Sequence, residues 1–270
     1  MKIVKQEKKS FREKILSDSK DYSLPLRSID SFFSNVPISK SVKIKKETIC
    51  TDRYFAGVVK DNEKSKFRNS IWGTCNLLGM DEKIVKKIFS IKDINQFYVG
   101  AQTLNEETGY RVYAGSYDST KSKGTGKAVE WSGDKKYKIR SYSGHRYGTS
   151  DELALDSLRM LKDNAVLNKI VVDFLLNVAG SKNLTSACNC VKSFKGNRET
   201  IDISLDFASS TIINSKKSIG KIFNYFNHEY NDYYKFFMPE IGNSIITRCQ
   251  WGLDSESNEF VNIYYMEKNI

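Results

Sequence analysis

The sequence predicts an α+β protein built around one antiparallel β-sheet. The strand-like segments alternate apolar with polar residues, so each predicted strand has one apolar face and one polar or aromatic face. A parallel sheet, which is buried on both faces, would show nearly continuous apolar strands instead. The segments also come in neighbouring pairs, 42–49 with 53–60 and 245–253 with 260–266, with helical segments between the pairs. The chain therefore follows an α-β-β-α pattern.

The composition is that of one folded domain spanning residues 1–270, long enough to bury a substantial core. An apolar content of 40% and an aromatic content of 12% exclude a disordered chain. No apolar run reaches membrane-spanning length, and none follows the basic N-terminal residues as in a signal peptide, so a cytoplasmic protein is expected. Five cysteines without a C-x-x-C pair and two histidines give no zinc pattern.

The net charge is +11, from 43 Lys and Arg against 32 Asp and Glu. Such a balance attracts phosphate, whether in a nucleic acid, an anionic membrane face or a small phosphorylated substrate. Lysines on solvated helix faces would produce much of the same excess. The charge alone leaves these interpretations open.

Apolar residues spaced three or four apart predict several helices. Asp81 is placed to cap the N-terminus of one of them. Helices are expected over residues 11–19, 24–34, 66–78, 81–89, 150–161, 214–226 and 232–238.

The polar faces of the predicted strands carry the chemistry. In 200–208, Asp202, Ser204 and Asp206 share the face opposite the apolar residues, and 169–178 is likewise predicted to be a strand, with Asp173 on its polar face. Two middle strands are expected over 110–115, with Arg111 and Tyr113 together, and over 136–142, with Lys138, Arg140 and Tyr142 together. The intervening 116–134 is predicted to be a long loop.

Whether the sheet is open or closed decides what these faces do. In an open sheet they are solvated, whereas in a closed sheet they line a polar, aromatic lumen. The repeated α-β-β-α pattern favours closure.

Four stretches of the chain, taken in order, resemble the ABBA prenyltransferases, and in particular the cyanobactin-type peptide prenyltransferases. They are SLPLRSIDSFF with the following TDRYFAGVV, then GYRVYAG, then GTSDELALDSLRML leading into VVDFLLNVAG, and finally FFMPEIGNSIITRCQWGLDSESNEFVNIYY. The resemblance implies a ten-stranded antiparallel barrel ringed by helices. It also implies transfer of an isoprenoid, dimethylallyl or longer, from an allylic diphosphate to a nucleophilic side chain of a ribosomally made, cyclic peptide.

Such a reaction needs cations around the departing diphosphate, usually with Mg²⁺, and aromatic rings around the allylic cation. Arg53 matches the family's first diphosphate-binding Arg, and Arg111 its basic position before the V-Y pair. The remaining cation candidates are Lys138, Arg140 and Arg248. The aromatic candidates are Tyr113, Tyr142 and Tyr264, with Tyr265 as a neighbour of the last. No DDxxD motif occurs, so Mg²⁺ is expected to bind through the diphosphate.

The base is where the sequence departs from the family. Tyrosine-prenylating members place a Glu on the first strand, but the same spacing back from Arg53 reaches no acidic residue. Glu47 is the nearer candidate, on the predicted strand 42–49. The other candidates are Asp173, Asp202 and Asp206.

Two other interpretations stay open. Basic residues interleaved with Tyr and Phe are also typical of a sheet that binds single-stranded nucleic acid, although no RNP-like run occurs. An α+β scaffold without catalysis would be preferred if the polar strand faces pointed outward to bulk water.

Overall fold

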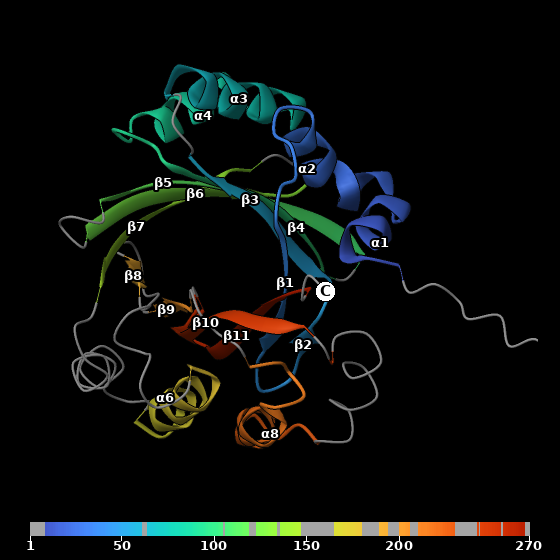
Figure 1. Ribbon diagram of the computed structural model, residues 1–270, viewed down its shortest axis with the longest axis vertical. Helices are drawn as coiled ribbons and strands as arrows, with labels where there is room; N and C mark the ends of the chain where they lie inside the picture. The colour runs from blue at the N-terminus through green and yellow to red at the C-terminus, as the bar shows by residue number, and fades with distance from the viewer. Residues whose placement is uncertain are drawn as a thin grey trace, which may run out of the picture.

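A computed structural model of the protein describes residues 9–60, 64–104, 106–118, 123–133, 136–146, 165–179, 189–193, 200–205, 210–229, 242, 244–254 and 256–267. Its centre is an antiparallel sheet with helices packed outside it (Figure 1). The strands are β1 (Ile38–Ile44), β2 (Ile49–Cys50), β3 (Arg53–Val59), β4 (Gln96–Leu104), β5 (Glu107–Asp118), β6 (Lys123–Trp131), β7 (Lys138–Arg146), β8 (Asn189–Ser193), β9 (Thr200–Ser204), β10 (Ile245–Leu253) and β11 (Glu259–Met266). The described helices are α1 (Phe11–Ser17), α2 (Lys20–Asp30), α3 (Lys64–Leu77), α4 (Glu82–Phe89), α6 (Ala165–Ala179) and α8 (Lys216–Tyr225).

The sheet closes on itself. The strands follow one another in the order β11-β10-β9-β8-β7-β6-β5-β4-β3-β1, and β11 pairs with β1 from Ser39↔Met266 to Ile44↔Val261. The two-residue β2 adds to the end of β1. Ten strands therefore form the ring among the described residues, which confirms the predicted antiparallel barrel.

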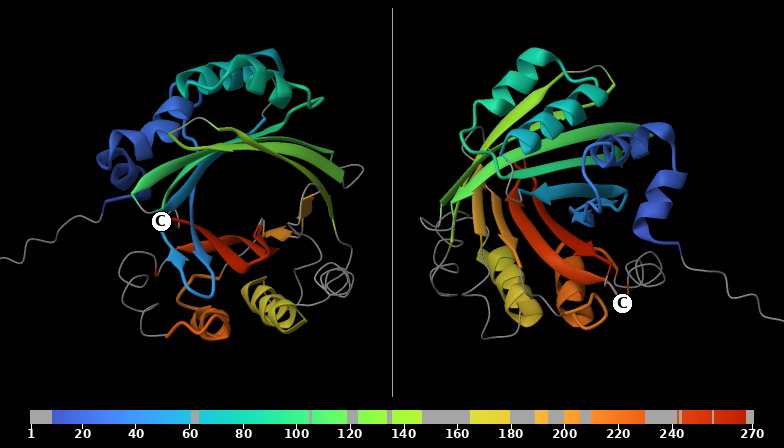
Figure 2. Two further views of the ribbon diagram at one scale, coloured as in Figure 1. Left: turned by 180° about the vertical axis from the view of Figure 1, so that it is seen from behind. Right: turned by 45° about the horizontal axis from the view of Figure 1, so that its top comes forward.

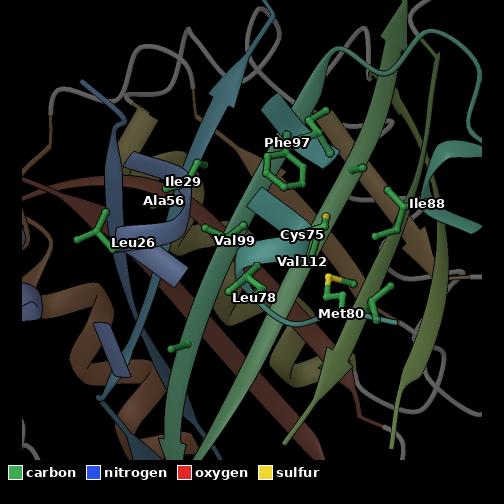
Figure 3. Packing of buried hydrophobic residues seen from close by; sticks show 14 of the residues in the cluster. Leu26, Ile29, Ala56, Cys75, Leu78, Met80, Ile88, Phe97, Val99 and Val112 are labelled. Atoms are coloured by element: carbon green, nitrogen blue, oxygen red, sulfur yellow. The ribbon is translucent and has the colours of Figure 1, made fainter. Parts of the chain in front are cut away.

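The described helices cover the outside of the barrel in two groups. Helices α1 to α4 lie over one side, and α6 and α8 lie over the opposite side, near β9 to β11 (Figures 1 and 2). Each group buries its own apolar core against the sheet. In the first core, Leu26 of α2 and Ile88 of α4 pack with Phe97 and Val99 of β4 (Figure 3). The apolar strand faces thus point outward to the helices, as the alternation predicts.

Most predicted helices are confirmed, and their ends have local causes. Asp81 caps α4 by accepting the Lys83 N–H at 2.7 Å. Helix α2 starts earlier than predicted, because Ser19 caps it and Pro25 lies inside it rather than at its start. The helices predicted over 150–161 and 232–238 lie outside the described residues. No described helix is both long and apolar enough to cross a membrane.

The strand predicted over 169–178 is wrong, because these residues belong to α6. Its apolar residues also satisfy the helical spacing of three and four, and they are buried on one side of the helix at Leu167, Val171, Phe174 and Val178. Fifteen residues favour a helix over a strand. Asp173 therefore lies exposed on the outside of the barrel.

The loop predicted over 116–134 is also wrong. β5 continues to Asp118, and β6 occupies Lys123–Trp131. The pattern was missed because the inward residues of β6 include Gly126 and Ala128, which give no contrast in hydropathy. In the predicted strand 42–49, β1 ends at Ile44, and Glu47 lies exposed in the turn before β2.

A partly buried ion pair joins two strand connections. Lys45, after β1, binds the Asp254 carboxylate at 2.5 Å, and the backbone N–H groups of Glu256 and Asn258 donate to the same carboxylate. Burial alone raises the pKa of Asp254, but these hydrogen bonds together outweigh it and hold the pKa below its usual value. The contribution to stability is therefore present above the usual carboxyl pKa of about 4 and is lost as the pH falls through the lowered value.

Asp254→Asn is expected to lower the free energy of unfolding by about 2 kcal/mol at neutral pH. It should also flatten the loss of stability below about pH 4, because the variant has no carboxylate to protonate. Urea denaturation across the acid range measures both effects. If the free energy of unfolding of the variant falls as steeply at low pH as that of the wild type, groups other than Asp254 cause the acid sensitivity.

Candidate active site

The inner face of the barrel is polar and aromatic. Along each strand, residues alternate between the outer cores and the inside, so Tyr54 and Val112 face helices while Phe55 and Arg111 face inward. The pairing register between neighbouring strands then places further inward-facing residues beside them. The interpretation as a scaffold with outward polar faces is therefore wrong for these strands.

The first inner network joins β5, β6 and β7. Glu130 forms an ion pair with Arg111 Nη2 at 3.0 Å and accepts a hydrogen bond from Arg140 Nε, also at 3.0 Å. Arg111 Nη2 also donates to the Tyr142 hydroxyl at 2.7 Å. One carboxylate thus holds two guanidinium groups side by side, and both side chains are largely buried.

The second inner network joins β3, β9, β10 and β11. Arg248 binds the Asp202 carboxylate with two nitrogens, Nε and Nη2. Gln250 Nε2 donates to Asp202 Oδ2 at 3.2 Å, and Asn262 Nδ2 donates to Gln250 Oε1 at 3.0 Å. Arg53 Nη1 donates to Asn262 Oδ1 at 2.7 Å. Two further guanidinium groups are fixed in this way.

The charge balance of the two networks favours an anion. Four guanidinium groups accompany two carboxylates. Burial alone lowers the pKa of Arg111, but Tyr142 and Glu130 outweigh it and raise the pKa above its usual value. Arg248 opposes this effect, so the two cations interact across the inner face. An anion with several charges would relieve that repulsion.

Aromatic rings lie between the cations. The guanidinium carbons of Arg53 and Arg111 are each 6.0 Å from the ring centroid of Phe55, and that of Arg248 is 5.0 Å from the ring of Tyr264. Phe55 and Tyr264 are themselves 5.8 Å apart. The inner face therefore combines positive charge with the π faces that stabilise a cation.

Three tyrosines, Tyr98, Tyr113 and Tyr142, form a continuous row, and each neighbouring pair of ring centroids is 5.9 Å apart. Glycines allow two of these rings to lie close to the sheet. A Cβ on Gly57 would lie 1.8 Å from the Tyr98 ring, and a Cβ on Gly126 would lie 2.4 Å from the Tyr113 hydroxyl. The row is therefore built into the barrel wall.

Solved structures share the fold. AnaPT from Neosartorya fischeri matches with a TM-score of 0.55 and 9% sequence identity, over 87% of this chain and 80% of that one. The NotF prenyltransferase matches with a TM-score of 0.53 and 9% identity, over 87% and 81%. The fold is an ABBA barrel. No family model and no curated protein matches the sequence.

The ABBA barrel brings together most of the residues predicted for its site. They are Arg53, Arg111, Arg140, Arg248, Tyr113, Tyr142 and Tyr264. Lys138 pairs with Glu130 in the register but is exposed, where β7 begins. Tyr265 points outward into the core beneath α6 and α8.

Of the predicted bases, Asp202 lies on the inner face, where Arg248 and Gln250 donate to it, whereas Glu47 and Asp173 do not. Glu47 lies in an exposed turn and Asp173 on an exposed face of α6, while Asp206 lies outside the described residues. Glu130 was missed because 116–134 was predicted to be a loop. Gln250 and Asn262 were missed as well, although strand alternation from Arg248 and from Tyr264 could have placed them on inner faces. Tyr98 was missed because no strand was predicted over 96–104.

No group of three His, Cys, Asp or Glu side chains able to hold a metal occurs in the part of the chain that the structure describes. Glu130 and Asp202 are each bonded by arginines. These residues fit a metal ion that binds through a bound anion.

Proposed function

We propose that the protein is a prenyltransferase that moves an isoprenoid, dimethylallyl or longer, from an allylic diphosphate to a nucleophilic side chain of a peptide. The observation that carries the proposal is the inner face, where four buried or partly buried arginines lie among five aromatic rings. The fold shared with the NotF prenyltransferase supports it. The peptide acceptor, a cyclic one, follows from the sequence resemblance.

The first chemical step breaks the bond between the allylic carbon and the diphosphate oxygen. The electron pair leaves with the diphosphate, whose charge rises as the bond breaks. Arg53, Arg111 and the other two arginines stabilise that charge because their positions are fixed before the reaction. When Mg²⁺ is bound, it supplies further positive charge to the diphosphate oxygens.

The second step joins the allylic cation to the acceptor. The faces of Tyr98, Tyr113 and Phe55 shield the cation from water and stabilise it. An electron pair of the acceptor side chain forms the new bond to carbon. The acceptor then loses a proton, and because it is cationic at that point, a weak base suffices.

Glu130 is the carboxylate we propose as that base. Its side chain is 27% exposed, whereas that of Asp202 is 2% exposed and accepts three donors. A carboxylate beside two arginines is a weak base. The proton therefore passes from the acceptor to a Glu130 oxygen after the new bond has formed.

The experiment that tests this function incubates the protein with dimethylallyl diphosphate and a library of linear and cyclic peptides, with and without Mg²⁺. We expect one prenyl group to be added to a peptide, detected by mass spectrometry, together with released diphosphate. Longer allylic diphosphates are tested in parallel. If no donor of any length is consumed, the protein is not a prenyltransferase.

Gly126→Ala is expected to lower kcat/KM for the allylic donor about tenfold, because the added methyl group displaces the Tyr113 ring from the wall. Gly109→Ala is the matched control, since its Cβ would lie 3.8 Å from the nearest atom, at ordinary contact distance. Steady-state kinetics with both variants measures the difference. Equal activities would show that the position of Tyr113 does not matter for the reaction.

A further inference from the structure

Asp202 lies at the end of a hydrogen-bond chain in which every donor points toward it. Arg53 donates to Asn262, Asn262 donates to Gln250, and Gln250 donates to Asp202. Arg248 donates to the same carboxylate from the other side. The chain therefore connects two arginines on β3 and β10 through residues of β9, β10 and β11.

The direction of the chain fixes the orientation of both amides. A carboxylate is an acceptor, so Gln250 must turn its NH₂ group toward Asp202 and its oxygen toward Asn262. Asn262 must then donate to Gln250, and its own oxygen is left to accept from Arg53. One charged group thus determines where Arg53, three hydrogen bonds away from it, is held.

The two arginines keep donors for a ligand. Arg53 is 5% exposed, and its Nε is buried with no hydrogen-bond partner among the described residues. A buried donor without a partner is costly, so this atom indicates a missing acceptor. Arg248 keeps its Nη1 outside the two bonds to Asp202.

We propose that Asp202 is a positioning residue, which holds Arg248 directly and Arg53 through Gln250 and Asn262, so that both guanidinium groups meet the diphosphate. The proposal rests on the proposed function for the identity of the ligand. Asp202 is not the base, because its side chain is 2% exposed and accepts three donors.

The first test needs no ligand. The Nε–H resonances of Arg53 and Arg248 are followed by NMR and assigned with Arg→Lys variants. Asp202→Asn is expected to shift both resonances, although Arg53 does not touch Asp202. Gln250→Met, which breaks the chain in the middle, is expected to shift the Arg53 resonance and leave Arg248 in place. Lys86→Ala, at an exposed ion pair on α4, should shift neither.

The second test measures the ligand. Calorimetry with inorganic pyrophosphate is expected to show a Kd about tenfold weaker for Asp202→Asn and about threefold weaker for Gln250→Met. In turnover, KM for the allylic donor should rise in both variants while KM for the peptide stays unchanged. A purely structural defect would affect both substrates.

The outcomes separate the two proposals. If Asp202→Asn shifts only Arg248, or Gln250→Met leaves Arg53 unmoved, the positioning chain is refuted whatever the protein catalyses. If the wild type neither binds pyrophosphate nor consumes an allylic donor, the proposed function fails while the NMR result still decides the chain. Should Asp202→Asn not fold, Gln250→Met alone gives the deciding comparison between Arg53 and Arg248.

Discussion

Arg111→Ala is expected to lower kcat/KM for prenyl transfer by about 10³-fold. Arg111 binds both Glu130 and Tyr142, and its guanidinium carbon lies 6.0 Å from the Phe55 ring centroid. Its guanidinium group therefore contacts the carboxylate of the first network, the tyrosine row and the ring that it shares with Arg53 of the second network. Removing it takes away a positive charge at the place where the diphosphate gains negative charge. Steady-state kinetics with dimethylallyl diphosphate measures the loss.

The fold should survive this change, because the Arg111 side chain lines the inside of the barrel rather than either apolar core. Thermal unfolding of Arg111→Ala should therefore stay close to that of the wild type. Lys86→Ala is the matched control for loss of a cation, since Lys86 lies in an exposed pair with Glu82. Undiminished turnover in Arg111→Ala would remove Arg111 from the diphosphate site.

Trp251→Ala is expected to lower the free energy of unfolding by about 4 kcal/mol. Trp251 is fully buried in the core beneath α6 and α8, and its indole Nε1 donates to Asn168 Oδ1 of α6 at 2.8 Å. The change leaves a large cavity and also removes a buried hydrogen bond between β10 and α6. Urea denaturation measures the loss.

Val166→Ala on α6, the helix to which Trp251 donates its hydrogen bond, is the control, because Val166 is 64% exposed. It should change the free energy of unfolding by less than about 0.5 kcal/mol. A small loss in Trp251→Ala would show that α6 contributes little to the stability of the barrel.

The sequence predicts much of the fold because strand alternation is a local property. The segments holding Arg53, Arg111 and Arg248 each show one polar face, and the structure brings these faces to one inner surface. Alternation fails where the inward residues are small, as at Gly126 in β6. It also fails where apolar residues satisfy two periods at once, as in α6, and Asp173 was misplaced for that reason.

Which side chains meet inside the barrel depends on how the sheet closes, and no local sequence pattern carries that information. Arg53 and Asn262 are separated by 209 positions and meet because β11 pairs with β1. The same pairing decides which carboxylate meets which arginine. Candidate cations could therefore be predicted one strand at a time, whereas the two networks could not.

The most direct test of the inner face as the donor site is a calorimetric titration with a dimethylallyl diphosphate analogue whose bridging oxygen is sulfur, which resists bond cleavage. The wild type and Lys86→Ala should bind it at one saturable site, and Arg111→Ala/Arg248→Ala should bind it at least about 100-fold more weakly. Equal affinity in all three proteins would contradict donor binding inside the barrel. Salt-sensitive binding of a single-stranded oligonucleotide without analogue binding would instead support a nucleic-acid-binding protein.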